Sequence, residues 1–198
     1  MGFYRRHLPH WHPDGASIFV TWRLSGSLPR ECRASYRLDA KATAGDRFAK
    51  TDRYLDRAVA GPRWLEDPRV ADCVVQAMAD VEAKWRLCEN FAWVVMPNHV
   101  HLLLRTERPL AEVMRPLKKN SAKAANVILG RTGMPFWQDE SFDHWARSYA
   151  EFLRITNYIE WNPVRAGLAE RPEDWKWSSA YGRSSAGAGR EPAPPGGR

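Results

Sequence analysis

Two short apolar segments with a turn between them constrain the fold of this chain more than any other feature. Residues 91–96 and 100–105 are rich in strand-forming side chains, and the pair Pro97-Asn98 between them has the residue types of a tight turn. The two segments therefore predict a β-hairpin. A hairpin of this kind becomes stable only when further strands or helices cover its apolar side chains.

The rest of the chain supplies those partners. Alternating apolar residues predict a first strand over 17–24, and an aromatic-rich segment predicts a last strand over 141–146. Apolar residues at helical spacing predict helices over 68–86, 110–129 and 149–161, the last of which should end before Pro163. The resulting order predicts an α+β fold, an antiparallel sheet with helices on one face.

The domain organisation predicted from the sequence is simple. The 198 residues are enough for a single domain, which we expect over 1–181, with a probable helical insertion over 29–63. Residues 182–198 are poor in apolar side chains and predict a disordered tail. Three cysteines without C-x-x-C spacing fit reduced thiols, and we see neither a membrane span nor a secretory signal, so we expect a cytoplasmic protein.

The charge of the chain suggests a polyanionic partner. The formal net charge is +7 and the isoelectric point is about 9.6, and basic side chains gain free energy when they displace counterions from phosphates. Ten tryptophans add a weak indication, because exposed aromatic rings stack on unpaired bases, although core packing is the better interpretation for any single one.

Two histidines interrupt the second strand of the predicted hairpin. His99 and His101 are two residues apart, so on a strand their imidazoles point to the same face. Neutral imidazole is a common ligand of divalent transition metals, and the pair predicts part of a coordination shell. Taken alone, a pair of hydrogen-bonded or exposed histidines at a strand end is an equally good interpretation.

The last predicted helix carries a second pair of interest. Tyr158 and Asn162 are four residues apart and would point the same way, offering a hydroxyl and an amide oxygen. A phenol beside a metal can act as a nucleophile on a phosphodiester. In isolation, a core tyrosine and an ordinary residue before proline are the better interpretations.

Several motifs together resemble one family. P-N-H-V-H-L-L after W-V-V-M, then a basic helix, then F-W-Q-x-x-S-F-D-H-W-A-R and N-Y-I-E-W-N-P-V-R-A-G-L, are similar to the single-tyrosine HUH transposases, and more narrowly to the REP-associated tyrosine transposases related to the IS200/IS605 enzymes. The opening Y-R-R-H-L-P-H-W and the strand S-I-F-V-T-W-R-L extend the resemblance over about residues 3–179.

The resemblance implies a ferredoxin-like (RRM-like) HUH domain and a set of roles. His99 and His101 would be metal ligands in the catalytic centre, Tyr158 the nucleophile, and Asn162 the residue that completes the metal shell, with Mg²⁺ or Mn²⁺ as cofactor. The family cleaves single-stranded DNA, leaving a 5′-phosphotyrosine and a free 3′-hydroxyl, at REP-like palindromes folded as hairpins. The protein would work as a monomer or homodimer at the bacterial nucleoid.

Basic residues outside this set are candidates for contact with DNA phosphates. A helix face carries several of them, an N-terminal arm could enter a groove, and one arginine precedes the helix of Tyr158. These candidates are Arg5, Arg6, Arg115, Lys118, Lys119, Lys123 and Arg147. A solvated helix face is the commoner role for such a stripe, and His7, His10 and His12 are more often surface residues than a second metal site.

Three functions remain open on the sequence. The first is DNA strand transfer through Tyr158. The second is binding of DNA hairpins by a chain that has lost its chemistry, and the third is hydrolysis of DNA by a metal-activated water with Tyr158 as a bystander. A covalent adduct between protein and DNA distinguishes the first from the other two.

Overall fold

A four-stranded antiparallel sheet forms the centre of the molecule. The computed structural model describes residues 2–5, 9–13, 15–28, 43–57 and 61–183. The sheet consists of β3 (Ser17–Arg23), β4 (Glu89–Val95), β5 (His99–Arg105) and β6 (Phe142–Trp145) in the order β4-β5-β3-β6. The predicted hairpin is confirmed, since β4 and β5 pair in antiparallel fashion. Strands β5 and β3 lie in the middle of the sheet, each between two neighbouring strands.

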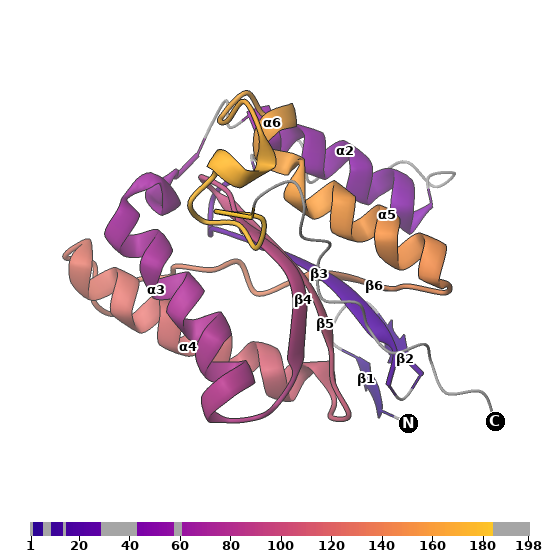
Figure 1. Cartoon of the computed structure of the whole chain (residues 1–198). Coiled ribbons are helices and arrows are strands. Elements are labelled where there is room, and N and C mark those ends of the chain that lie inside the picture. Colours follow the sequence, from indigo (N-terminus) through magenta and orange to yellow (C-terminus); the bar gives the residue numbers. More distant parts are fainter. Residues whose placement is uncertain (1, 6–8, 14, 29–42, 58–60, 184–198) are drawn as a thin grey trace.

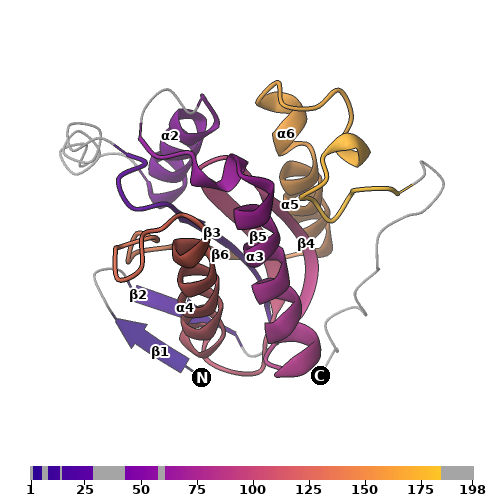
Figure 2. The same cartoon turned by 90° about the vertical axis from the view of Figure 1, so that its left-hand side faces the viewer.

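Helices cover both faces of this sheet. Helices α3 (Pro68–Ala79) and α4 (Leu110–Ile128) lie on one face, whereas α2 (Ala44–Arg57) and α5 (Tyr149–Glu160) lie on the other (Figures 1 and 2). The α+β class and the antiparallel sheet are thus confirmed, and α3 and α4 occupy one face as expected. The opposite face is covered as well, because it also presents apolar side chains that need partners.

Two hydrophobic cores result from the alternation of side chains along the strands. Val100, Leu102 and Leu104 of β5 contribute to the core beneath α3 and α4, which also holds Trp22 and Trp137. Leu103 contributes to the second core, together with Phe19 and residues of α5. Ring contacts tie α2 into this second core, since Phe48 lies 5.5 Å from Phe19 between ring centroids.

The ends of the helices follow their sequence signals, with one addition. Asp67 caps α3 by accepting a hydrogen bond from the Arg69 backbone, and the helix then widens into a π-helical turn (η2, Asp80–Lys84) where a continuous helix to 86 was predicted. Helix α5 ends at Glu160, before Pro163 as predicted. The chain then re-enters a short helix, α6 (Asn162–Arg165), because proline is well accommodated in a first helical turn.

The N-terminal segment differs from expectation. No strand was predicted for the N-terminal arm, but β1 (Gly2–Arg5) and β2 (Pro9–His12) form a separate two-stranded antiparallel sheet. Short η1 (Trp64–Glu66) and η3 (Pro172–Asp174) turns complete the elements, and the chain after η3 pairs with the outer edge of β4 at Ser178.

Cys73 and Cys88 are free thiols.

Several sequence predictions lie outside the described residues. These are Arg6, His7, Cys32, the first part of the 29–63 insertion and the tail from 184 onward. Within the described part of the chain, no helix combines the length and the apolar character that crossing a membrane requires.

Candidate functional site

His99 and His101 meet at the start of β5, on the face covered by α2 and α5. Both side chains are fully buried, and their Nε2 atoms lie 3.0 Å apart. The other nitrogen of each ring is held from behind. His99 Nδ1 donates to Asn98 Oδ1 at 2.6 Å, and His101 Nδ1 lies 2.7 Å from Thr21 Oγ1 on β3. Such contacts orient imidazoles for metal binding, because they turn the free Nε2 lone pairs toward a common point.

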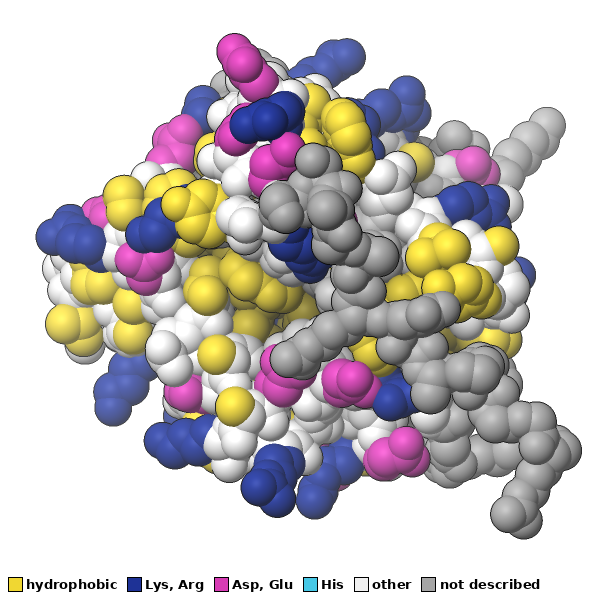
Figure 3. Space-filling model, viewed as in Figure 1, with side chains coloured by type: hydrophobic (Ala, Val, Ile, Leu, Met, Phe, Trp, Pro, Cys, Tyr) yellow, Lys and Arg dark blue, Asp and Glu magenta, His cyan; other side chains and the backbone are white. Residues whose placement is uncertain are grey.

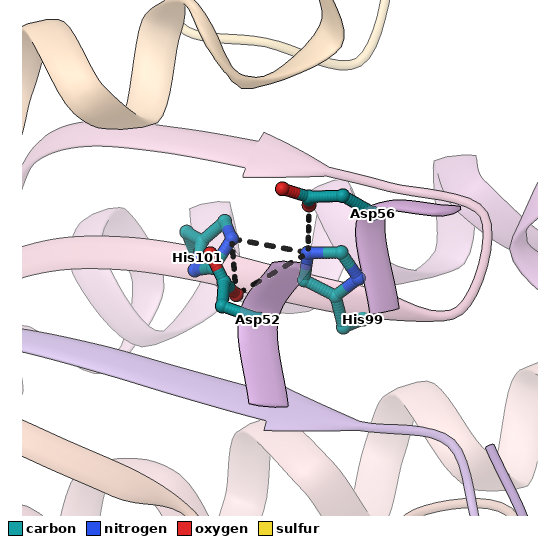
Figure 4. A group of neighbouring side chains, drawn as sticks. All are labelled: Asp52, Asp56, His99 and His101. Carbon is teal, nitrogen blue, oxygen red and sulfur yellow. Dashed lines mark hydrogen bonds and ion pairs between the residues drawn. The ribbon is translucent and has the colours of Figure 1, made fainter. Parts of the chain in front are cut away.

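Two carboxylates approach the same point from helix α2. Asp52 Oδ1 lies 3.4 Å from His101 Nε2, and Asp56 Oδ1 lies 3.6 Å from His99 Nε2 (Figure 4). Asp52 and Asp56 are four residues apart on α2, so both side chains point to the sheet. One ligand atom from each of these four residues can be chosen so that all four atoms lie within 4.8 Å of one another.

Burial sets the protonation of this cluster. Desolvation lowers the pKa of His99 to about 3, and desolvation together with the neighbouring His99 and Arg165 lowers the pKa of His101 well below its usual range. Desolvation, with repulsion from Asp56, raises the pKa of Asp52 to about 8. Desolvation also raises the pKa of Asp56 to about 6. Because both imidazoles are neutral at neutral pH, their contacts with the two aspartates are not ion pairs.

The polar atoms of the cluster lack partners in a way that a metal ion would correct. Both carboxylate oxygens of Asp52, Oδ1 of Asp56 and Oδ1 of Asn162 are buried without a hydrogen bond. An unsatisfied buried polar atom costs about 1–3 kcal/mol. Two imidazole nitrogens with several side-chain oxygens form a donor set that accepts Mn²⁺, Mg²⁺ and other divalent ions. The residues thus fit a divalent metal.

Asn162 joins the cluster from the junction of α5 and α6. Its side chain is fully buried and its Nδ2 lies 3.2 Å from His101 Nε2. The amide nitrogen and oxygen are assigned from the surrounding contacts, and a 180° turn of the amide places the unpartnered oxygen toward the histidines instead. The predicted proximity of Asn162 to His101 is therefore present in the structure.

Tyr158 lies one helical turn before Asn162 and packs against the same histidine. Its ring centroid is 5.7 Å from that of His101 and 6.0 Å from that of Phe19. The Arg165 guanidinium covers the ring at 4.3 Å from the centroid. The side chain is partly exposed and lines a cavity of about 410 Å³. The structure thus brings His99, His101, Tyr158 and Asn162 together.

Asp52 and Asp56 were missed in the sequence analysis, where the 29–63 stretch had no assigned role. One signal could have found Asp52. Phe48, Asp52 and Leu55 follow a helical spacing in which the outer two are apolar, so the aspartate falls on the stripe that faces the core. A carboxyl group at such a position is costly unless it is paired or coordinates a metal, so an aspartate on a core-facing stripe indicates a functional site.

The candidate DNA-binding residues do not gather at this cluster. Arg115, Lys118, Lys119 and Lys123 lie on α4, which covers the other face of the sheet. Lys118 Nζ donates to the carbonyl oxygens of Gln138 and Asp139, at 2.6 Å and 3.0 Å, so it also fixes the segment before β6.

The remaining candidates lie elsewhere. Arg147, between β6 and α5, is exposed and its backbone N–H donates to Glu151 Oε2 at 2.8 Å. Arg5 lies in β1, and Arg6 is outside the described residues. On the face drawn in Figure 3, Lys and Arg side chains alternate with Asp and Glu and do not form a single basic patch.

Comparisons with known proteins agree with the resemblance seen in the sequence. The chain is 28% identical over 93 residues to the REP-associated tyrosine transposase of Escherichia coli (strain K12), covering 46% of this chain and 53% of that protein. It is 27% identical over 111 residues to a Haemophilus influenzae protein that bears the same name provisionally, covering 47% and 59%. The chain thus spans little more than half the length of these relatives, and no family model matches it.

A solved structure extends the comparison to nearly the whole chain. The structure of a REP-associated tyrosine transposase bound to a REP hairpin superimposes with a TM-score of 0.54 at 20% identity, covering 90% of this chain and 82% of that one. At this identity the match establishes the shared fold. The resemblance to REP-associated tyrosine transposases is therefore confirmed in sequence over about half of the chain, and in fold over most of it.

Proposed function

We propose that this chain is a metal-dependent enzyme that cleaves and rejoins single-stranded DNA through Tyr158. One observation carries the proposal. Two segments far apart in the sequence, the start of β5 and the end of α5, place a phenol and an amide beside two buried imidazoles with facing nitrogens. Each residue has a structural explanation when taken alone, but a core tyrosine does not require an unsatisfied cluster of two histidines, an asparagine and two aspartates next to it.

In this proposal the side chains divide the chemistry between them. His99, His101, Asn162 and the two aspartates of α2 would hold a divalent metal, which when bound would polarise a phosphodiester oxygen. Tyr158 Oη attacks the phosphorus, the bond from phosphorus to the 3′ oxygen breaks, and a 5′-phosphotyrosine forms. The phenol gives up its proton to solvent, and the departing 3′ oxygen takes one up to become a 3′-hydroxyl. Attack by a 3′-hydroxyl on the phosphotyrosine reverses the step and joins strands.

The proposed substrate is hairpin DNA of the REP type. The net charge of +7 favours binding to a polyanion. The solved structure that superimposes on 90% of this chain contains a bound REP hairpin. The basic residues of α4, Arg5, Arg6 and Arg147 would contact phosphates outside the cleavage site. The protein would act at the bacterial chromosome in the cytoplasm, as a monomer or homodimer, with Mg²⁺ or Mn²⁺ as its metal.

A covalent adduct tests this function directly. Wild-type protein and a Tyr158→Phe variant are incubated with Mn²⁺ and labelled hairpin oligonucleotides from repeats around the gene, and denaturing gels are run. Tyr181→Phe is a matched control, because this exposed tyrosine belongs neither to the His/Asp cluster nor to the lining of the cavity beside Tyr158. We expect a DNA-linked protein band from the wild type and the control, and none from Tyr158→Phe or His99→Ala.

Two other outcomes would replace the proposal. Cleavage that survives in Tyr158→Phe without an adduct would indicate hydrolysis by water. Tight hairpin binding without any cleavage would indicate a binding protein.

A further inference from the structure

A positively charged cavity adjoins both the nucleophile and the metal cluster. The cavity of about 410 Å³ is bordered by Tyr158 and by Asp56. Its remaining charged lining consists of three arginines, Arg53 and Arg57 from α2 and Arg165 from α6. Arg53 and Arg57 are exposed, so the cavity is accessible from solvent. A space with three cations and one carboxyl beside a candidate nucleophile favours an anionic ligand.

Arg165 is the arginine held most closely against that nucleophile. It ends α6, less than one full turn after Asn162, so one helix junction positions both residues and Tyr158. Its Nη2 donates to the backbone oxygen of Tyr158 at 2.6 Å, and its guanidinium carbon lies 4.3 Å from the centre of the phenol ring. Both contacts fix the guanidinium in place without neutralising its charge.

The carboxyls of Asp56 and Asp52 attract the charge of Arg165 but do not pair with it directly. Among the described residues, no carboxylate oxygen lies within 4.0 Å of its nitrogens, although Asp56 borders the same cavity. A guanidinium has five donors in a planar fork that matches the oxygens of a phosphate, and one of its nitrogens is used by the Tyr158 carbonyl. The remaining donors suit a ligand with several negatively charged oxygens.

We propose that Arg165 binds the scissile phosphodiester while Tyr158 attacks it, and that α2 forms the outer wall of this phosphate site through Arg53 and Arg57. The inference rests on the proposed function and adds a catalytic residue to it. It also gives a role to α2, whose segment has none in the sequence analysis. The helix contributes carboxylates to the metal cluster and arginines to the adjoining cavity.

The position of Arg165 suits the redistribution of charge in the reaction. As the bond from Tyr158 Oη to phosphorus forms and the bond to the 3′ oxygen breaks, negative charge is spread over the phosphoryl oxygens and over both oxygens in line. The phenol proton goes to solvent, and the 3′ oxygen is protonated by solvent. A fixed cation beside the phenol ring and the phosphate stabilises this distribution more than it stabilises the neutral phenol.

The competing interpretation is that Arg165 only stabilises the end of α5 through the Tyr158 carbonyl. That role predicts a loss of thermal stability in Arg165→Ala but no dependence on the charge of any phosphate. An experiment that changes the charge of single phosphates as well as the arginine distinguishes the two interpretations. A methylphosphonate linkage removes one negative charge from one phosphate while the rest of the DNA is unchanged.

The experiment uses the full chain in a Tyr158→Phe background, so that binding is measured without cleavage. A hairpin oligonucleotide is prepared with a single methylphosphonate at each successive linkage, and its affinity is compared for Arg165, Arg165→Ala and Arg165→Lys. Arg171→Ala is the matched control, because Arg171 is a surface arginine whose ion pairs are with Asp174 and Glu173. Thermal unfolding of each protein checks its fold, and Arg165→Lys serves if the alanine variant unfolds.

At one linkage we expect neutralisation to weaken binding about 10-fold with Arg165 and less than 2-fold with Arg165→Ala, in the range of a charge-assisted hydrogen bond. That linkage should be the one that the wild type cleaves. With Tyr158 restored, Arg165→Ala should slow adduct formation by about 100-fold or more, Arg165→Lys by less, and Arg171→Ala by less than 2-fold.

The outcomes separate the inference from the proposed function. If the wild type forms the adduct but no methylphosphonate linkage weakens binding more with Arg165 than with Arg165→Ala, the inference is overturned and the proposed function stands. Coupling at a linkage other than the cleaved one would overturn the assignment to the scissile phosphate. A wild type that binds hairpins but forms no adduct would overturn the proposed function, and with it the scissile assignment, whatever the scan shows.

Discussion

The two faces of the central sheet are equally buried and chemically opposite. Strand β5 shows the contrast within a few residues, since Val100, Leu102 and Leu104 point to α3 and α4 while His99 and His101 point to α2 and α5, all with no exposed surface. The first face contains a continuous apolar core. The second combines a smaller apolar core with the histidines, Asp52 and Asn162, and several of their atoms lack hydrogen-bond partners.

The difference shows how the fold accommodates a buried polar cluster. Burying unsatisfied polar atoms opposes folding, by about 1–3 kcal/mol for each atom. The apolar face offsets this cost, and the strands it fixes hold the histidines in position. The apolar core and the candidate site thus use alternate residues of the same strands, and substitutions on the two faces should have different effects on stability and on metal binding.

The largest effect should come from the apolar face. Leu102→Ala removes a fully buried side chain and leaves a cavity, so we expect the free energy of unfolding to fall by about 2–5 kcal/mol, measured by denaturant titration. The loss should be the same with a divalent metal and with chelator. Val127→Ala on the exposed side of α4 should change it by less than about 0.5 kcal/mol. A similar loss in both variants would show that the α3/α4 face is not the main source of stability.

The second prediction concerns metal binding on the other face. Mn²⁺ at about 100 times its dissociation constant should stabilise the wild type by about 2.7 kcal/mol, seen as a rise in melting temperature. His101→Ala and Asp52→Asn should lose most of this rise, because the first removes an imidazole ligand and the second replaces an anionic carboxylate with a neutral amide, whereas Leu102→Ala should keep it. If Asp52→Asn responds like the wild type, the carboxylate charge of Asp52 does not contribute to metal binding.

The third prediction reverses the usual sign of a core substitution. With chelator present, Asp52→Asn should be more stable than the wild type at pH 8, by about 1–3 kcal/mol. Burial raises the pKa of Asp52 to about 8, so the folded state resists ionisation that the unfolded chain undergoes near its ordinary value of 3.8. The wild type therefore loses stability as pH rises from about 4 to 8, and the difference between the two proteins should vanish below pH 4. A difference that does not depend on pH would contradict this account.

The smallest effect should arise at the start of α5, which carries Tyr158. Ser148 Oγ accepts from the Glu151 backbone, and Glu151 Oε2 accepts from the Arg147 backbone, which together cap the helix. Ser148→Ala should reduce the free energy of unfolding by about 1 kcal/mol. Glu151→Gln should have a smaller effect that disappears in acid, since hydrogen bonds from His144 and Arg147 lower the pKa of Glu151 and its contribution is lost on protonation. Equal losses at pH 7 and pH 3 would argue against a role for the charge.

The sequence predicted the sheet and most helices because those elements depend on local periodicity. The alternation in β3 and β5 and the capping residues of α3 are visible without tertiary structure. The predicted proximity of His99, His101, Tyr158 and Asn162 is present in the structure. The spacing within the strand puts both histidines on one face, and the spacing within the helix does the same for Tyr158 and Asn162. A single contact between that strand and that helix is then enough to bring all four side chains together. Asp52 and Asp56 were missed because their segment is charged and only weakly periodic, and the short apolar stripe of Phe48 and Leu55 was the one signal that it packs on the sheet. The two-stranded β1–β2 sheet was missed for a similar reason, since a segment of four residues has too little pattern to identify.

The side chain of Asn98, in the turn of the β4–β5 hairpin, links two parts of the site through a single amide. Its oxygen accepts from His99 Nδ1 and its nitrogen donates to the Leu55 carbonyl of α2 at 3.1 Å. The same amide group therefore sets the tautomer of the His99 imidazole and helps to position α2, the helix that carries both aspartates. An aspartate at position 98 would keep the contact with His99 and lose the one with Leu55, so the amide of Asn98 links the orientation of a candidate ligand to the position of α2.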